Sequence, residues 1–172
     1  MLGFAYKLRA SGEVDLIALA KSVGLGPELM ILDNHTEKAL NQLGDYRITQ
    51  FPENMVEDSV TGWPLENSDD WYSYVRRWYF NKENNNQIYF TYETYITDLT
   101  DANETLRLYV SGENGLERVT IQGHSGITQQ EGNRAKVVWI VGDAAKGVSF
   151  QLYSEQFTVE QLLTAAESVQ QY

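Results

Sequence analysis

Two aromatic runs separated by one short polar stretch constrain the fold more than any other feature of this sequence. Trp71 to Phe80 read WYSYVRRWYF, Gln87 to Ile96 read QIYFTYETYI, and the polar residues NKENNN lie between them. Aromatic and β-branched residues favour strands, and a short polar turn between two such runs is typical of a β-hairpin. The sequence therefore predicts a long antiparallel hairpin in the middle of the chain.

Further strand candidates surround this hairpin, and most of them are separated by short turns that contain Gly or Asn. They are Tyr46–Met55, Leu106–Val110, Leu116–Gln122, Gly126–Gln130, Ala135–Val141 and Val148–Tyr153. Pro52 is expected to end the first of them, because proline cannot donate to a strand ladder. Residues 57–70, which mix turn formers with acids, are expected to be an exposed loop. Short connections join antiparallel rather than parallel strands.

Helical patterns occur towards both ends of the chain. Thr158 and Gln161 form a capping box in front of an apolar stripe, and a second amphipathic pattern covers Gly12–Val23. A shorter helix is expected from Thr36 to Leu43, with Gly44 ending it. The predicted fold class is α+β. We expect a twisted antiparallel sheet of about six to eight strands, with two helices, Gly12–Val23 and Thr158–Gln170, packed on one face.

The beginning of the chain repeats the pattern of its end. YKLRASGEVDLIALAKSV (6–23) matches FQLYSEQFTVEQLLTAAESV (150–169), with Leu8 aligned to Leu152 and Leu16 to Leu162. Any strand followed by an amphipathic helix could produce this likeness. Alternatively, residues 1–26 are the tail of one tandem copy and residues 45–172 a complete second copy. We treat residues 1–172 as a single domain, because this length suits one core.

The region from RVTIQGHSG (118–126) to the C-terminal helix resembles the C-terminal signature of the domain of unknown function 4367 family. The matching positions are Gly123, Gly126, Trp139, Phe150, Leu152, Leu162, Ala166, Glu167, Ser168 and Val169. The resemblance is strongest over 118–170. FPENM (51–55) resembles another segment of the family, although Asn54 replaces the usual glycine.

This resemblance implies an extracytoplasmic domain of Gram-positive membrane-anchored and anti-sigma-factor-like proteins. It implies no enzymatic activity and no cofactor. Some members of the family suggest kinship with curved-sheet folds that carry lipoproteins, hold an apolar ligand or bind a protein partner.

Charge and composition disfavour several classes of function. The chain has 13 Lys and Arg against 24 Asp and Glu, a formal net charge of -11, which repels nucleic acid and anionic lipid surfaces. It has no Cys, so disulfides and thiolate sites are excluded. No apolar run approaches the ~20 residues that span a bilayer. We therefore expect contact with a membrane only through an anchor outside this chain.

The aromatic hairpin supplies the candidate binding residues, which are Trp71, Tyr74, Arg76, Arg77, Trp78 and Tyr92. Strand alternation places Tyr72, Tyr74, Arg76, Trp78 and Phe80 on one face, and this nearly all-aromatic face is expected to meet the core or a concavity. One interpretation is a cross-strand aromatic ladder within the core. The other is a surface for a glycan, peptide or lipid, with Arg76 and Arg77 gripping an anion.

No catalytic residue or metal site is predicted. GHSG (123–126) lacks the last glycine of a nucleophile elbow, since Ile127 stands there, so it favours a tight turn over a Ser125–His124 active site. Asp98, Asp101, Asn103 and Glu104 lack the loop glycine of a calcium-binding EF-hand.

The predicted function is a non-enzymatic binding or sensory module of a bacterial envelope protein, outside the cytoplasm. Its expected partner is another envelope protein or an apolar ligand. One alternative is a carrier that holds an apolar ligand in a curved sheet lined by Trp78, Phe80, Phe90 and Tyr92. The other is a small hydrolase of unrecognised type.

Overall fold

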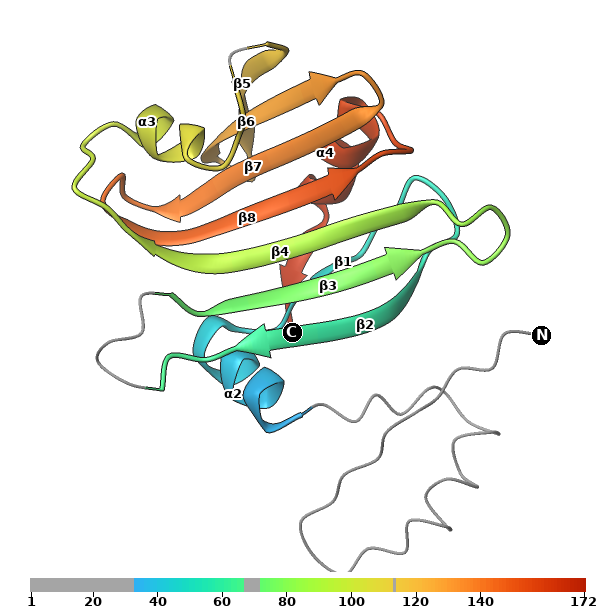
Figure 1. Ribbon diagram of the computed structural model, residues 1–172, viewed down its shortest axis with the longest axis horizontal. Coiled ribbons are helices and arrows are strands. Elements are labelled where there is room, and N and C mark those ends of the chain that lie inside the picture. Colours follow the sequence, from blue (N-terminus) through green and yellow to red (C-terminus); the bar gives the residue numbers. More distant parts are fainter. Residues whose placement is uncertain (1–32, 67–71, 113) are drawn as a thin grey trace, which may run out of the picture. The chain divides into compact units, whose positions relative to one another are not determined.

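The computed structural model describes residues 33–66, 72–112 and 114–172. At their centre lies a seven-stranded antiparallel sheet with the strand order β2-β3-β4-β8-β7-β6-β5 (Figure 1). Its strands are β2 (Val56–Trp63), β3 (Tyr74–Phe80), β4 (Gln87–Ile96), β5 (Leu116–Ile121), β6 (His124–Glu131), β7 (Arg134–Gly142) and β8 (Lys146–Ser154). A separate pair joins β1 (Tyr46–Ile48) to β9 (Val169–Gln171). The helices are α2 (Asn34–Leu43), α3 (Ala102–Arg107) and α4 (Val159–Glu167). The predicted α+β class and antiparallel sheet are confirmed.

The hairpin and the strands after Leu116 form close to where the sequence predicts them. β3 pairs with β4 throughout its length, from Tyr74 opposite Glu93 to Phe80 opposite Gln87. The turn expected in GHSG is formed by Gln122 and Gly123, with φ of 52° and 81°. A two-residue hairpin turn with two positive φ angles matches the twist of its strands, so His124 already belongs to β6.

Two predicted elements are wrong. Residues 57–63, half of the expected exposed loop, belong to β2, an edge strand whose mixed polar sequence reflects a solvent-facing side and a bulge between Glu57 and Ser59. A strand was expected at Leu106–Val110, but Leu106 ends up buried in α3. The side chain of Asp101 caps that helix by accepting a hydrogen bond from the Asn103 N–H at 2.8 Å.

α4 has its predicted N-cap but ends at Glu167, before the predicted Gln170, and the N-cap of α2 is not the predicted Thr36. α4 has the expected capping box between Thr158 and Gln161. α2 begins earlier than expected, because Asp33 is its N-cap and accepts from the Thr36 N–H at 2.7 Å. Thr36 is instead buried, and its hydroxyl accepts from the Gly62 N–H at 3.0 Å. The predicted helix at Gly12–Val23 and the N-terminal repeat lie outside the described residues.

α2, α4 and the β1–β9 pair all pack on one face of the sheet, which we call the covered face. Its core combines side chains of these elements with those of the sheet, among them Ala39, Val75, Phe90, Tyr92, Trp139, Phe150, Leu152, Leu162 and Ala166. Gly62 in β2 allows α2 to approach closely, since a Cβ there would lie 2.8 Å from the Cβ of Ala39.

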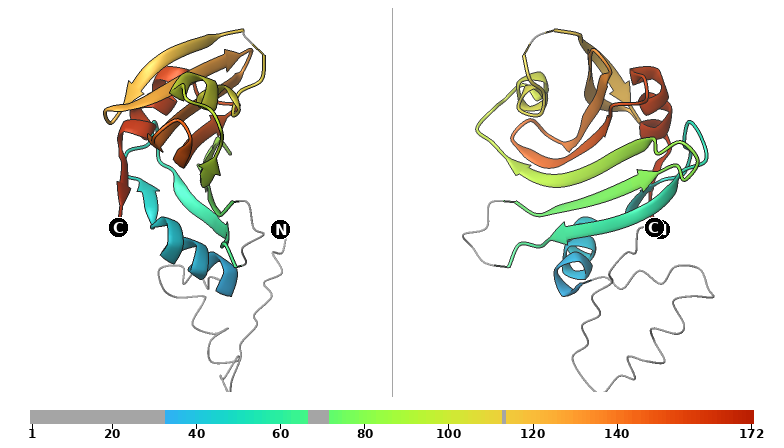
Figure 2. Two further views of the ribbon diagram at one scale, coloured as in Figure 1. Left: turned by 90° about the vertical axis from the view of Figure 1, so that its left-hand side faces the viewer. Right: turned by 45° about the vertical axis from the view of Figure 1, so that its right-hand side comes forward.

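The opposite face is covered only in part. α3 packs against β6 and β7, where Leu106 joins Ile127, Val138 and Ile140 in a second, smaller core. Figure 2 shows α3 and α4 on opposite sides of the sheet. Over β3, β4 and the C-terminal half of β8, no helix of the described residues packs on this face, and we call this part the open region.

The C-terminal end of α4 is fixed by the tip of the β5–β6 hairpin. The side-chain amide of Gln122 donates to the carbonyls of Ala166, at 3.3 Å, and Val169, at 2.8 Å, while its backbone N–H donates to the Glu167 carboxylate at 3.0 Å. These bonds satisfy carbonyls that a helix end leaves without partners. The helix is thereby held against the sheet on which its apolar stripe packs.

Two tryptophans differ in burial, so removing each of them should lower the stability of the fold by a different amount. Trp139 is 1% exposed in the main core, whereas Trp63 is 50% exposed and stacks on His35. Trp139→Ala should lower the free energy of unfolding by about 3–5 kcal/mol. Trp63→Ala should lower it by about 1 kcal/mol or less. Urea denaturation followed by circular dichroism measures both, and equal losses would contradict this assignment of the core.

Candidate functional site

The alternation of β3 sorts the sequence-predicted site residues onto two faces. Val75, Arg77 and Tyr79 are buried on the covered face. Tyr74 and Trp78 are half-buried and Arg76 is exposed on the opposite face. Of the two expected positions for the nearly all-aromatic face of β3, the main core is wrong, because this face lies away from it. Trp71 lies outside the described residues.

Arg77 is buried inside the covered face, where its guanidinium meets groups of the protein itself. Its side chain is 1% exposed, and its Nη1 lies 2.6 Å from Glu57 Oε2. Its Nη2 is paired with the carboxylate of Asp45, and its Nε donates to the Tyr46 carbonyl at 2.9 Å. Burial alone would lower the pKa of Arg77, but the nearby charges, Glu57 foremost, raise it. The guanidinium thus stays charged, with every nitrogen engaged.

Tyr92 is also part of the interior. It is 0% exposed, its hydroxyl donates to the Gly44 carbonyl at 2.8 Å, and the same hydroxyl accepts from the Tyr46 N–H at 3.3 Å. Burial raises the pKa of Tyr92 to about 12. Tyr92 therefore ties β4 to the turn before β1 and offers no surface to a ligand.

The four residues expected to line an apolar cavity do not share a face. Phe90 and Tyr92 are fully buried on the covered face, while Trp78 and Phe80 alternate onto the other side of the sheet. Phe90 stacks with Trp139 at a ring-centroid distance of 6.5 Å, and Tyr92 stacks with Phe150 at 5.7 Å. These rings pack against one another in the core.

An aromatic ladder crosses three neighbouring strands in the open region. Trp78 of β3 lies opposite Tyr89 of β4, which lies opposite Tyr153 of β8. The ring centroids of Trp78 and Tyr89 are 5.5 Å apart, and those of Tyr89 and Tyr153 are 6.1 Å apart. All three side chains are half-buried. We use the term aromatic ladder for these three residues.

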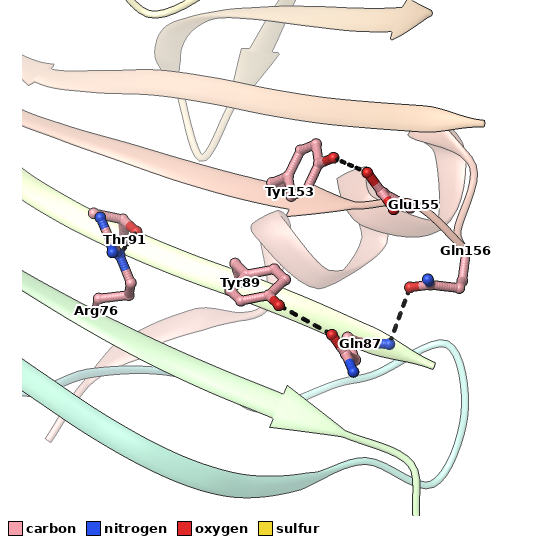
Figure 3. A pocket seen from close by; sticks show the side chains of 7 residues that line it. All are labelled: Arg76, Gln87, Tyr89, Thr91, Tyr153, Glu155 and Gln156. Carbon is pink, nitrogen blue, oxygen red and sulfur yellow. Dashed lines mark hydrogen bonds between the residues drawn. The ribbon is translucent and has the colours of Figure 1, made fainter. Parts of the chain in front are cut away.

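A shallow hollow of about 460 Å³ lies beside two members of this ladder, Tyr89 and Tyr153. Its lining residues are Arg76, Gln87, Tyr89, Thr91, Tyr153, Glu155 and Gln156 (Figure 3). The Tyr89 hydroxyl donates to Gln87 Oε1 at 3.0 Å, and the Tyr153 hydroxyl donates to Glu155 Oε1 at 2.7 Å. Gln87 and Glu155 each lie two residues from the tyrosine that they bind. Both tyrosine rings therefore lean along the direction of the chain.

Several side chains that line the hollow have N–H groups that make no hydrogen bond within the described residues. Arg76 Nε donates to Thr91 Oγ1 at 3.3 Å, and the guanidinium carbon lies 5.8 Å from the centre of the Tyr74 ring. Gln156 Oε1 accepts from the Gln87 N–H at 3.2 Å. Within the described part of the chain, no hydrogen bond uses the Nη atoms of Arg76 or the Nε2 atoms of these two glutamines. The hollow can therefore donate hydrogen bonds to a ligand.

Charges of both signs lie around the ladder. Glu93 and Lys136 are on the same face, on β4 and β7, and Gln151 Nε2 donates to Glu93 Oε1 at 3.4 Å. Burial raises the pKa of Glu93, although Arg76 and Lys136 oppose the shift. Burial lowers the pKa of Lys136, although Glu93 opposes it. Lys136 also donates to the Tyr109 carbonyl. Together with Arg76 and Glu155 these groups leave the surface close to neutral.

The other motifs do not gather into a site. His124 and Ser125 are consecutive residues of β6, so their side chains point to opposite faces of the sheet. Asp101, one of the acids weighed for calcium, caps α3. Among residues 33–66, 72–112 and 114–172, no group of three or more His, Asp or Glu side chains is placed to hold a metal ion.

Sequence reasoning found only a minor part of this surface. It singled out Tyr74, Arg76 and Trp78, which do lie together. It missed Tyr153 and Glu155, because nothing local in the sequence indicates that β8 lies beside β4. Only the strand alternation of 87–95, which places Tyr89 and Thr91 on one face, could have pointed to the part of the hollow on β4.

Comparison of this chain with known proteins found no relative. No family model, no curated protein and no solved structure matches the chain. The resemblance of residues 118–170 to the domain of unknown function 4367 family therefore stays a prediction. In the described part of the chain, no helix combines the length and the apolar character needed to cross a membrane.

The two adjacent arginines of β3 offer a matched pair of variants. Arg77→Met leaves the carboxylate of Glu57 buried without its partner and should cost about 3–5 kcal/mol of stability. Arg76→Met removes an exposed side chain and should change stability by about 0.5 kcal/mol or less. Chemical denaturation measures both, and a large loss for Arg76→Met alone would reverse the assignment of the two faces.

The same ion cluster predicts part of the acid sensitivity. Burial of Asp45 opposes its ionisation, but the bond from Arg47 and the charge of Arg77 outweigh it, so its pKa lies below 3.8. A depressed carboxyl pKa stabilises the fold above the unfolded pKa and loses that effect as the pH falls through the folded pKa. Wild type should therefore exceed Asp45→Asn in stability at neutral pH, and the gap should shrink below pH 3.8. Denaturant titrations across this range test it; a constant gap would contradict it.

Proposed function

We propose that this chain is a non-enzymatic binding module of a bacterial envelope protein, working outside the cytoplasm, and that the aromatic ladder with its hollow is the binding surface. The observation that carries the proposal is the position of the ladder. Three aromatic side chains are aligned across β3, β4 and β8 in a region that no described helix covers. Aromatic clusters at partly exposed positions are the usual anchors of binding surfaces.

The strands beneath the ladder support this role. β3, β4 and β8 are interior strands of the sheet, each bonded to a neighbour on both sides. The covered face beneath them is filled by the main core, in which Phe90 and Leu152 are fully buried. A surface built on such elements holds its side chains in place before a ligand arrives, so binding costs less conformational entropy.

The envelope context is supported by the sequence resemblance alone. Residues 118–170, which carry that resemblance, form β5 to β8, α4 and the start of β9. Their signature positions Trp139, Phe150 and Leu162 are core residues, so they support a shared fold more than a shared ligand.

The two rival functions receive less support from the geometry. A hydrolase built on Ser125 would need a base beside it, and its neighbour His124 points to the opposite face. A carrier would need Trp78 and Tyr92 to face one cavity, whereas the sheet separates them. The binding module requires no rearrangement of the described residues.

The proposal is tested with the full chain labelled with nitrogen-15 and mixed in turn with three envelope fractions of a Gram-positive bacterium. These are cell-wall fragments, vesicles of its lipids and its solubilised envelope proteins. At least one fraction should shift or broaden the indole N–H signal of Trp78 while leaving that of the buried Trp139 unchanged. Tyr89→Ala should weaken the response, and Trp63→Ala, outside the hollow, should not. Signals that change only on the covered face, or with none of the fractions, would overturn the proposal.

A further inference from the structure

The hollow beside the aromatic ladder must recognise its ligand with side chains alone. Every strand beneath it is paired on both sides, and at the start of β4 the Gln87 N–H donates to Gln156 Oε1, so the backbone groups there already have partners. An extended peptide that binds by adding a strand needs an edge strand, and in the described part of the chain the edge strands of this sheet are β2 and β5. Strand addition is therefore unavailable at the hollow.

The side chains that line the hollow are suited to hydroxyl groups. Gln87, Gln156 and Arg76 offer N–H donors without partners in the described residues, and Glu155 offers carboxylate acceptor capacity beyond its bond from Tyr153. Hydroxyl groups both donate and accept, so they can satisfy donors and acceptors that lie side by side. A ligand rich in hydroxyl groups can use both kinds of partner at once.

The tyrosines supply the apolar part of the site. Because Tyr89 and Tyr153 lean along their strands towards Gln87 and Glu155, their rings lie beside the polar groups of the hollow (Figure 3). A sugar ring combines an apolar C–H face with a rim of hydroxyl groups. It can lay that face on an aromatic ring while its rim meets the surrounding amides and carboxylate.

The charges favour a neutral ligand. An anionic polymer would meet Glu155 and Glu93 and a chain of net charge -11, and a cationic ligand would meet Arg76 inside the hollow. Glu155 is already paired with Arg134 at 3.4 Å. The charge of Arg76 is opposed by the nearby carboxylate of Glu93, so an added charge of either sign meets a group of its own sign as well as one of the opposite sign.

The geometry points to a neutral saccharide chain as the ligand of this hollow, an inference that rests on the proposed function and names the ligand of the same surface. The ladder extends over three strands, with successive ring centroids 5.5 and 6.1 Å apart. This length accommodates more than one sugar ring. Tyr74, beside Arg76, continues the aromatic surface along β3.

Isothermal titration calorimetry on the full chain tests the inference with defined probes. The neutral probes are the disaccharide and tetrasaccharide of N-acetylglucosamine and of β-linked glucose. The comparison probes are heparin, as an anionic polysaccharide, and palmitate, as an apolar ligand. At least one neutral series should bind, with the tetrasaccharide tighter than the disaccharide, and heparin and palmitate should bind more weakly.

Variants locate the binding. Tyr89→Ala and Gln87→Ala should each weaken tetrasaccharide binding by about tenfold or more, with circular dichroism confirming that both variants fold. Tyr172→Ala is the matched control, because Tyr172 is 72% exposed and lies beside Arg47, away from the hollow. Tetrasaccharide binding that Tyr89→Ala leaves unchanged would overturn the site.

Failure of this inference differs from failure of the proposed function. If no neutral saccharide binds but solubilised envelope proteins or lipid vesicles still shift the Trp78 signal, the saccharide is wrong and the binding module stands. The saccharide is also wrong, and the binding module still stands, if palmitate or heparin binds tightest and Tyr89→Ala abolishes that binding. If neither the defined probes nor the envelope fractions affect Trp78, both are overturned.

Discussion

The buried guanidinium of Arg77 is the interaction on which the arrangement of this domain depends. It joins β3 to Glu57 of β2, to Asp45 before β1 and to the carbonyl of Tyr46. A buried charge is tolerated only when its hydrogen-bonding groups are satisfied, and here all three nitrogens are. Because Tyr46 begins β1 and β1 pairs with β9, the cluster also fixes where the C-terminal strand lies.

Placing Arg77 inside determines what the other face of β3 presents. A strand turns successive side chains to opposite faces, so Arg76 and Trp78 must point away from the main core. The β3–β4–β8 register then aligns Trp78 with Tyr89 and Tyr153. The candidate binding surface is thus a consequence of the ion cluster on the other side of the sheet.

Much of the fold could be predicted because its signals are local. The hairpin of 71–96, the turn at Gln122 and Gly123 and the capping box of α4 each depend on residues close together in sequence. β2 was missed because an edge strand with a bulge does not alternate cleanly. The strand expected at Leu106–Val110 was a helix end, since the cap supplied by Asp101 outweighed the strand-like alternation.

The candidate site was predictable only in the part that lies on the hairpin. The sequence by itself determined that β3 has one face with Tyr74, Arg76 and Trp78 and another with Val75, Arg77 and Tyr79, because strand alternation is a local property. Each face carries aromatic rings and one arginine, so the local pattern could not say which is buried. The tertiary structure decided it, because Asp45 and Glu57, distant from Arg77 in sequence, meet only one of the two arginines and make its burial possible.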